Sequence, residues 1–190
     1  MGNWLFKNRG WLGLPFFLVA VIFAKAHLTL FLCGVLLVLL GESVRWASVA
    51  FSGPTTRSKK VEAPRLATQG PYALVRNPIY WGNFFIGLGM TVSSAAFWPW
   101  LAFVFVFVFW LEYIPIILAE ENYLKQRFGK EYESYTKSVH RLLILPKKTS
   151  WSNGQWKNAL KSEKSTLIVI LVYYSTVALR LYLEVMFAHR

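Results

Sequence analysis

The residues best suited to chemistry lie in one short stretch, 69–83 (QGPYALVRNPIYWGN), where a polar, basic loop turns into an apolar segment. A residue before proline is pushed toward extended dihedrals, so we expect Asn77 to cap a helix that begins at Pro78. A helix start presents unsatisfied N–H groups and the positive end of the helix dipole, and Arg76 adds a full charge there. The pattern favours binding of a small anion such as a carboxylate. It is equally typical of an interfacial arginine that faces lipid phosphate.

A second candidate region surrounds the adjacent carboxylates of Glu120 and Glu121. Pro115 is expected to kink the helix before them and to change the direction of the residues that follow. Neighbouring side chains on a helix diverge, and Glu121 can pair with Lys125 one turn later. We therefore expect Glu121 on the outer face and Glu120 in a pocket. The alternative is a solvated helix exit.

Aromatic and basic residues follow the acidic pair. Gly129 is expected to end the helix, and residues 130–139 to form a short amphipathic helix that brings Tyr132 and Tyr135 close together. Arg141 comes directly afterwards. Tyrosines at this spacing are often simple packing residues at an interface.

Two stretches of the chain together resemble the isoprenylcysteine carboxyl methyltransferase and phospholipid methyltransferase group of integral membrane enzymes. They are GPYALVRNPIYWGN at 70–83 and EENYLKQRFGKEYESYTKSVHRLLILP at 120–146. The shared pattern is GPY, R-[HN]-P-x-Y-x-G, a membrane hairpin, EE, FG-x-EY-x-x-Y, and an arginine before a final apolar residue and proline. All these parts occur here in order. The resemblance covers less than half of the chain and says little about the substrate.

The resemblance implies methyl transfer from S-adenosylmethionine, with no metal in the site. It implies catalytic roles beside the acceptor for Arg141, which would orient a carboxylate, and for Glu120, which would be the base for an amine or thiol. Many carboxyl-methylating relatives have His where this chain has Asn77, which cannot titrate near neutrality. The implied cofactor-binding residues are Gly70, Pro71, Tyr72, Arg76, Asn77, Pro78, Tyr80, Gly82, Glu120, Tyr132 and Tyr135.

The composition indicates a polytopic membrane protein, because 55% of the 190 residues are hydrophobic, 17% are aromatic and nine are Trp. The net charge is +12. The basic residues lie between apolar runs, so cytoplasmic loops and anionic lipid head groups explain them better than nucleic acid does. The single Cys33 permits no intramolecular disulfide, and the chain has no Asp and only three scattered His, which argues against a metal site.

The expected fold is an all-α membrane bundle of about five transmembrane helices, with the cofactor pocket at its cytoplasmic face. The expected spans are 11–24, 28–49, 78–92, 95–118 and 166–187. Glu42 and Arg45 are expected to pair near the end of the second span, either as a polar wall of the site or as an interfacial ion pair. Arg180 and Glu184 are expected to pair within the last span.

The chain divides into an N-terminal hairpin (1–51), a methyltransferase core (52–146), and a basic linker with a last span (147–190). Its basic residues predict a multi-pass protein with the N-terminus and both motif segments in the cytoplasm. The loop 52–69 is either part of the cover of the site or a basic linker that touches lipid. Membrane lipids and an amphiphilic or prenylated small-molecule acceptor are the expected partners, and the oligomeric state is open.

Two other functions are compatible with parts of the sequence. The C-terminal part of the sterol reductases looks like the same pattern, so an NADPH-dependent membrane reductase is one alternative, although those enzymes have more spans. The other is a non-catalytic membrane scaffold with a degenerate pocket. A scaffold would be expected to lose the arginine, glutamate and tyrosine positions, which are all present here.

Overall fold

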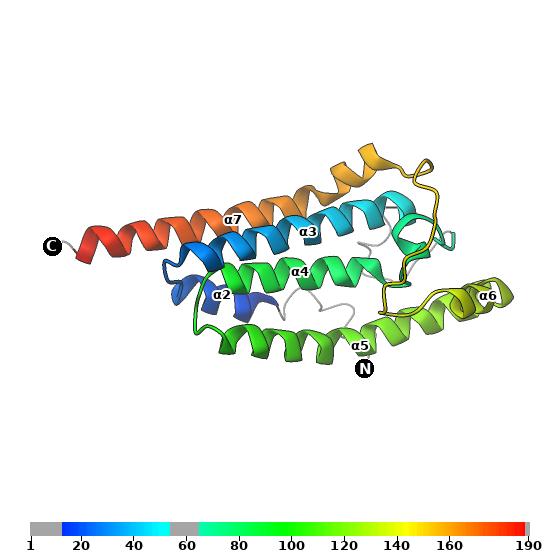
Figure 1. Cartoon of the computed structure of the whole chain (residues 1–190), viewed down its shortest axis with the longest axis horizontal. Coiled ribbons are helices and arrows are strands. Elements are labelled where there is room, and N and C mark those ends of the chain that lie inside the picture. Colours follow the sequence, from blue (N-terminus) through cyan, green and yellow to red (C-terminus); the bar gives the residue numbers. More distant parts are fainter. Residues whose placement is uncertain (1–12, 54–64, 189–190) are drawn as a thin grey trace.

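The computed structural model describes residues 13–53 and 65–188, and within these ranges the regular elements are all helical (Figure 1). This confirms the all-α class. The elements are α2 (Gly13–Ile22), α3 (Leu28–Ser52), the 3₁₀ turn η2 (Gly70–Ala73), α4 (Pro78–Ser93), α5 (Trp100–Phe128), α6 (Lys130–Ser138) and α7 (Trp156–Ala188).

Three of the described helices, α3, α5 and α7, are long and apolar enough to cross a membrane. Their outward faces carry large apolar side chains such as Leu36, Phe107 and Leu171, as expected where lipid replaces water. Helices α2 and α4 are shorter, with 10 and 16 residues. The count of five spans therefore stays a prediction.

Helices α3 and α4 run antiparallel at the centre and touch through facing glycines (Figure 1). A Cβ atom on Gly34 would lie 2.4 Å from the carbonyl oxygen of Gly89, and one on Gly41 would lie 2.7 Å from that of Gly82. Only glycine permits this backbone approach, which is the usual packing device of membrane helices.

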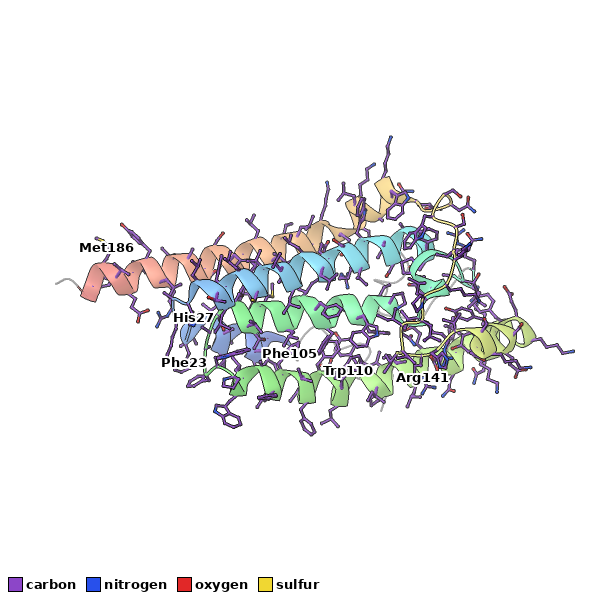
Figure 2. The ribbon with its side chains drawn as sticks, in the orientation of Figure 1. Phe23, His27, Phe105, Trp110, Arg141 and Met186 are labelled. Atoms are coloured by element: carbon purple, nitrogen blue, oxygen red, sulfur yellow. The ribbon has the colours of Figure 1, made fainter. Side chains whose placement is uncertain are left out.

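Aromatic rings fill the space between α4 and α5, where Phe105 and Trp110 lie (Figure 2). The rings of Phe109 and Tyr113 stack with centroids 4.1 Å apart, and Trp110 meets Trp81 edge-on at 5.2 Å. Phe16 of α2 packs edge-on against Phe105. This aromatic core fixes the position of α5 relative to the start of α4.

The fourth and last spans differ from expectation at their ends, whereas the predicted start of the first, at residue 11, lies outside the described residues. Helix α5 begins at Trp100, not at residue 95, because residues 94–99 form the turn from α4. Helix α5 continues through Pro115 to Phe128 and ends at Gly129, whose φ of 49° suits glycine.

Helix α7 begins at Trp156, ten residues before the predicted start of the last span. The sequence predicts a polar linker for residues 156–165. They are helical because Trp156 and Ala159 pack on α3, near Phe51. Further along α7, Arg180 pairs with Glu184 as predicted and also donates to the carbonyl oxygen of Ile22 at 2.9 Å.

Candidate functional site

The two motif segments meet at one end of the bundle, where residues 139–149 run back along the loop before α4 (Figure 1). The Arg76 N–H donates to the His140 carbonyl at 2.9 Å, and the Leu145 N–H to the Leu74 carbonyl at 3.1 Å. The Trp81 indole donates to the Leu142 carbonyl at 3.0 Å. The fold therefore brings residues 70–83 and 120–146 into one site, as the sequence predicts.

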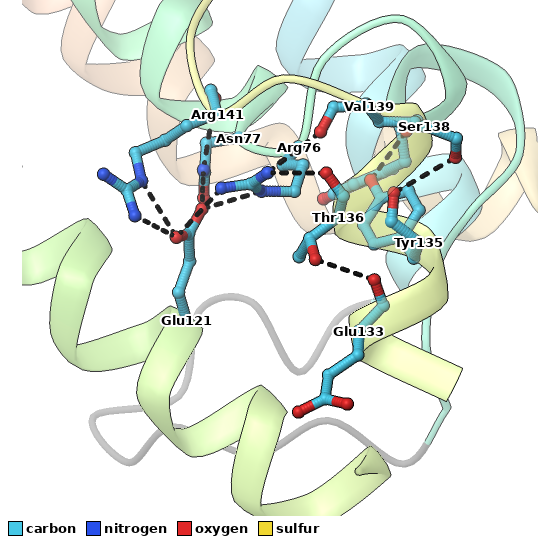
Figure 3. A network of polar contacts seen from close by, with 10 residues as sticks. Arg76, Asn77, Glu121, Glu133, Tyr135, Thr136, Ser138, Val139 and Arg141 are labelled. Atoms are coloured by element: carbon cyan, nitrogen blue, oxygen red, sulfur yellow. Dashed lines mark hydrogen bonds and ion pairs between the residues drawn. The ribbon is translucent and has the colours of Figure 1, made fainter. Parts of the chain in front are cut away.

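Glu121 is the centre of this site (Figure 3). Arg76 donates to its two carboxylate oxygens from Nε at 3.0 Å and from Nη2 at 3.2 Å. Asn77 Nδ2 donates at 3.0 Å, and Arg141 donates from Nε at 2.9 Å, with its Nη2 2.8 Å away. We call Arg76, Asn77, Glu121 and Arg141 the Glu121 cluster.

The two arginines of the Glu121 cluster differ in burial and in how many of their N–H groups are hydrogen-bonded within the protein. Arg76 is largely buried and also donates from Nη1 to the Val139 carbonyl at 2.9 Å. Arg141 has a side chain that is 44% exposed, against 9% for Glu121. The hydrogen bond to Glu121 raises the pKa of Arg141, so it stays charged. Two guanidinium groups share one carboxylate, and the excess positive charge lies on the open side, at Arg141.

The predicted orientation of Glu121 is wrong. Its expected partner, Lys125, instead pairs with Glu133 at 3.5 Å on the exposed surface. Glu121 points inward because the end of α5 is covered on two sides, by the loop before α4 and by residues 139–149, so both adjacent carboxylates find an inner partner.

Glu120 accepts a 2.5 Å hydrogen bond from the Tyr80 hydroxyl. Tyr80 is itself buried, with its ring 5.3 Å from that of Tyr113. Glu120 therefore lies on the α4 side of the cluster, where it is half-buried, whereas Glu121 is buried, so the place of Glu120 in a pocket stays a prediction.

Asn77 and Pro78 occupy the predicted positions at the start of α4. The predicted capping by the Asn77 side chain is absent, because its amide donates to Glu121 and, at 3.2 Å, to the Arg141 carbonyl. Asn77 thus ties the helix start to both other segments of the site.

Tyr132 and Tyr135 face the cluster from α6. The Tyr135 hydroxyl donates to the Tyr72 carbonyl at 2.6 Å, and burial raises the pKa of Tyr135 above its ordinary value. Tyr132 is only 4% exposed, and its hydroxyl has no hydrogen-bond partner among the described residues. Burial, and secondarily the charge of Glu121, raises the pKa of Tyr132 to about 12. A protonated, buried and unpartnered donor beside the Glu121 cluster is suited to a bound polar ligand.

The motif residues around Tyr72 shape the backbone of the site. Gly70 has a φ of 59°, and a Cβ there would lie 2.6 Å from the Phe51 ring. Pro71 is buried, and its carbonyl accepts from Leu74 and Val75. Burial raises the pKa of Tyr72, with smaller effects from a Ser52 hydrogen bond and from the charges of Glu120 and Arg45.

Arg45 and Glu163 lie just inside the site; the sequence offered Arg45 as part of a polar wall of the site and gave Glu163 no role. Arg45 of α3 was expected to pair with Glu42; its Nε and Nη2 instead donate to Glu163 of α7 at 3.0–3.2 Å, and its Nη1 donates to Asn83 Oδ1. The Arg45 stem lies over Gly82, where a Cβ would be 2.4 Å from Arg45 Cγ. Glu163 sits in a lysine-rich stretch that reads as a linker. Its spacing from Ala159, which also faces α3, was the available signal.

The comparisons agree with this architecture. The model of the phospholipid methyltransferase family matches residues 28–131, which is more than half of the chain. These apolar helices with a polar site at one end form an integral membrane protein. The chain belongs to the phospholipid methyltransferase family.

Curated relatives are similar over the same region. The chain is 30% identical over 119 residues to protein-S-isoprenylcysteine O-methyltransferase B of Arabidopsis thaliana, covering 60% of this chain and 59% of the relative. It is 34% identical over 131 residues to the protein-S-isoprenylcysteine O-methyltransferase of Schizosaccharomyces pombe, covering 66% and 52%.

A third relative has a different name. The chain is 30% identical over 116 residues to the nickel-cobalt-cadmium resistance protein NccN of Alcaligenes xylosoxydans xylosoxydans, covering 60% of this chain and 48% of the relative. The chain thus spans about half to three-fifths of the length of these relatives. No solved structure matches it.

Proposed function

We propose that this protein is a multi-pass membrane methyltransferase that uses S-adenosylmethionine and methylates an acceptor with a lipid-like or prenyl tail. The observation that supports this most directly is the Glu121 cluster, in which motif residues from three separate segments converge on one carboxylate. The family supports the same reaction.

The residues of the site suit the polar end of the cofactor. Arg141 would bind its carboxylate, because this guanidinium is exposed and carries the excess charge of the cluster. Tyr132 would donate a further hydrogen bond from its unpartnered hydroxyl. Glu120 would offset the positive charge of the ammonium or sulfonium group. Arg76 and Asn77 would hold Glu121 in place, since their polar groups are already engaged.

The cofactor supplies a methyl group on a sulfonium centre, which is already activated for in-line displacement. For a carboxylate acceptor, an oxygen lone pair forms the new O–CH₃ bond while the S–CH₃ bond breaks, and the sulfur keeps that electron pair. The products are a methyl ester and neutral S-adenosylhomocysteine, and no proton moves. An amine would have to lose a proton, and Glu120 would be the base that takes it. The protein's main task is alignment.

A prenylcysteine carboxylate is the acceptor we favour. The Arabidopsis and Schizosaccharomyces relatives carry isoprenylcysteine O-methylation in their names. The site also lies at one end of apolar helices, where a prenyl tail can remain in lipid while its carboxylate enters the polar site. We place this end in the cytoplasm because the basic residues gather there.

The first test is isothermal titration of detergent-purified protein with S-adenosylhomocysteine and, separately, NADPH, with Arg141→Ala and Glu120→Ala as site variants. We expect binding of S-adenosylhomocysteine that either change weakens. The matched control is Glu133→Ala, which removes an exposed carboxylate from the neighbouring helix and should bind normally.

The second test supplies methyl-labelled S-adenosylmethionine with N-acetyl-S-farnesylcysteine or phosphatidylethanolamine. A carboxylate acceptor gives a methyl ester that base hydrolyses to volatile methanol, whereas a methylated amine retains its label. Binding of NADPH alone would contradict the methyltransferase proposal, and binding of neither NADPH nor S-adenosylhomocysteine would favour the scaffold.

A further inference from the structure

Helix α7 lies beyond residues 28–131, which the family model matches, yet it supplies a buried carboxylate close to the site. Glu163 is 0% exposed. Arg45 reaches it side-on, with Nε–Oε2 at 3.1 Å, Nη2–Oε2 at 3.0 Å and Nη2–Oε1 at 3.2 Å. We call these two residues the Arg45 pair.

The third nitrogen of Arg45 points toward the motif residues. Nη1 donates to Asn83 Oδ1 in the second turn of α4. The stem of Arg45 lies on Gly82, the glycine of the R-N-P-x-Y-x-G pattern. The charge of Arg45 also acts on the Tyr72 hydroxyl, as does that of Glu120. Arg45 therefore lies beside both the GPY motif, through Tyr72, and the R-N-P-x-Y-x-G motif, through Gly82.

A buried ion pair is weak evidence for stability, because desolvation of two charges offsets most of their attraction. The Arg45 pair does, however, have a clear geometric effect. The two oxygens of Glu163 fix the plane of the guanidinium, and this plane aims Nη1 at Asn83. Without Glu163, the guanidinium of Arg45 would lose the two oxygens that fix its plane and would be free to turn away from Asn83.

We propose that α7 is a working part of the cofactor pocket. In this proposal Glu163 is a positioning residue: it keeps Arg45 on Gly82 and Asn83, and so holds the first turns of α4 in the geometry that the cofactor requires. The inference rests on the proposed function and adds to it a contribution from a helix outside the matched family segment.

The test is titration of the detergent-purified full chain with S-adenosylhomocysteine, comparing wild type with Glu163→Gln and Glu163→Asp. We expect Glu163→Gln to weaken binding at least tenfold, and Glu163→Asp, which keeps the charge, to recover part of the loss. Glu184→Gln removes the carboxylate of the exposed ion pair in the same helix and should leave affinity unchanged. Thermal unfolding of each variant separates positioning from simple support of the fold.

Wild-type affinity in a folded Glu163→Gln variant would overturn the inference, whether or not its melting temperature falls. If Glu163→Gln cannot be purified, the apolar double variant Arg45→Met/Glu163→Leu replaces it. That variant should fold and bind weakly, and normal binding would again refute the proposal. Absence of binding by wild type would instead remove the proposed function, and the inference with it.

Discussion

The Glu121 cluster and the Arg45 pair are two arginine–carboxylate assemblies at the same end of the molecule, and they differ in charge balance. In the cluster, two guanidinium groups share one carboxylate and the outer one is half exposed. In the pair, one guanidinium meets one carboxylate that is completely buried. An assembly with excess charge on its open side is suited to bind an ion, whereas a closed, neutral pair is suited to fix a neighbour. The following variants should separate these roles.

The largest effect on stability is expected from Glu121→Ala. It leaves Arg76, a mostly buried arginine, and Arg141 without their shared counter-charge, which typically costs about 3–5 kcal/mol. Denaturant titration in micelles should show the loss. Glu133→Ala, which breaks only the exposed pair with Lys125, should cost less than about 1 kcal/mol. Equal losses for both variants would mean that the cluster is no more than a surface network.

A smaller loss is expected from Gly82→Ala. The added Cβ would meet Arg45 Cγ at 2.4 Å and the Gly41 carbonyl at 2.9 Å, so α3 or Arg45 must shift, at a cost of about 1–3 kcal/mol. Gly13→Ala is the matched control, since a Cβ there meets nothing within 4 Å. We expect Gly82→Ala also to weaken S-adenosylhomocysteine binding. An unchanged affinity would show that the position of Arg45 does not matter for the cofactor.

The double variant Arg45→Met/Glu163→Leu should cost less stability than either single change, because a closed ion pair can be replaced by apolar side chains at little cost, within about 1.5 kcal/mol. The equivalent change in the cluster, Arg76→Met/Glu121→Leu, cannot be neutral, since it leaves Arg141 unpaired. A double-variant cycle of unfolding free energies measures both. Similar coupling energies for Arg45 with Glu163 and for Arg76 with Glu121 would mean that the pair and the cluster do not differ in this respect.

The smallest effect on stability is expected from Arg141→Ala, about 1 kcal/mol or less, because the side chain is half exposed and Glu121 keeps Arg76. Its effect on ligand affinity should be large, on the order of tenfold or more, since a charge-assisted hydrogen bond is lost. Calorimetry on the variant and on Lys125→Ala, a nearby exposed cation, tests this difference. Equal affinities would assign the carboxylate of the ligand to another residue.

The sequence was sufficient where local rules dominate. Pro78 does begin α4, Gly129 does end α5, and the two motif segments do meet. Each of these follows from the backbone limits of proline and glycine or from the apolar runs between the motifs.

The sequence was insufficient where partners lie far apart along the chain. Glu121 was assigned to Lys125 because that pair is local, whereas its real partners, Arg76 and Arg141, are 45 and 20 residues away. Arg45 and Glu163 are 118 residues apart, and a local pairing rule favoured Glu42 instead. Helical spacing tells which partners are possible, but burial decides between them.

The facing glycines of α3 and α4 limit how this protein can move. A shift of one residue along the helix axis, roughly 1.5 Å, would bring side chains of one helix against the backbone of the other, where the gap admits no Cβ. Sliding of α3 along α4 is thus blocked, and these two helices form the rigid part of the molecule. Any closure around a ligand must therefore come from the parts next to this pair, such as the loop before α4 and α6 with the segment that follows it.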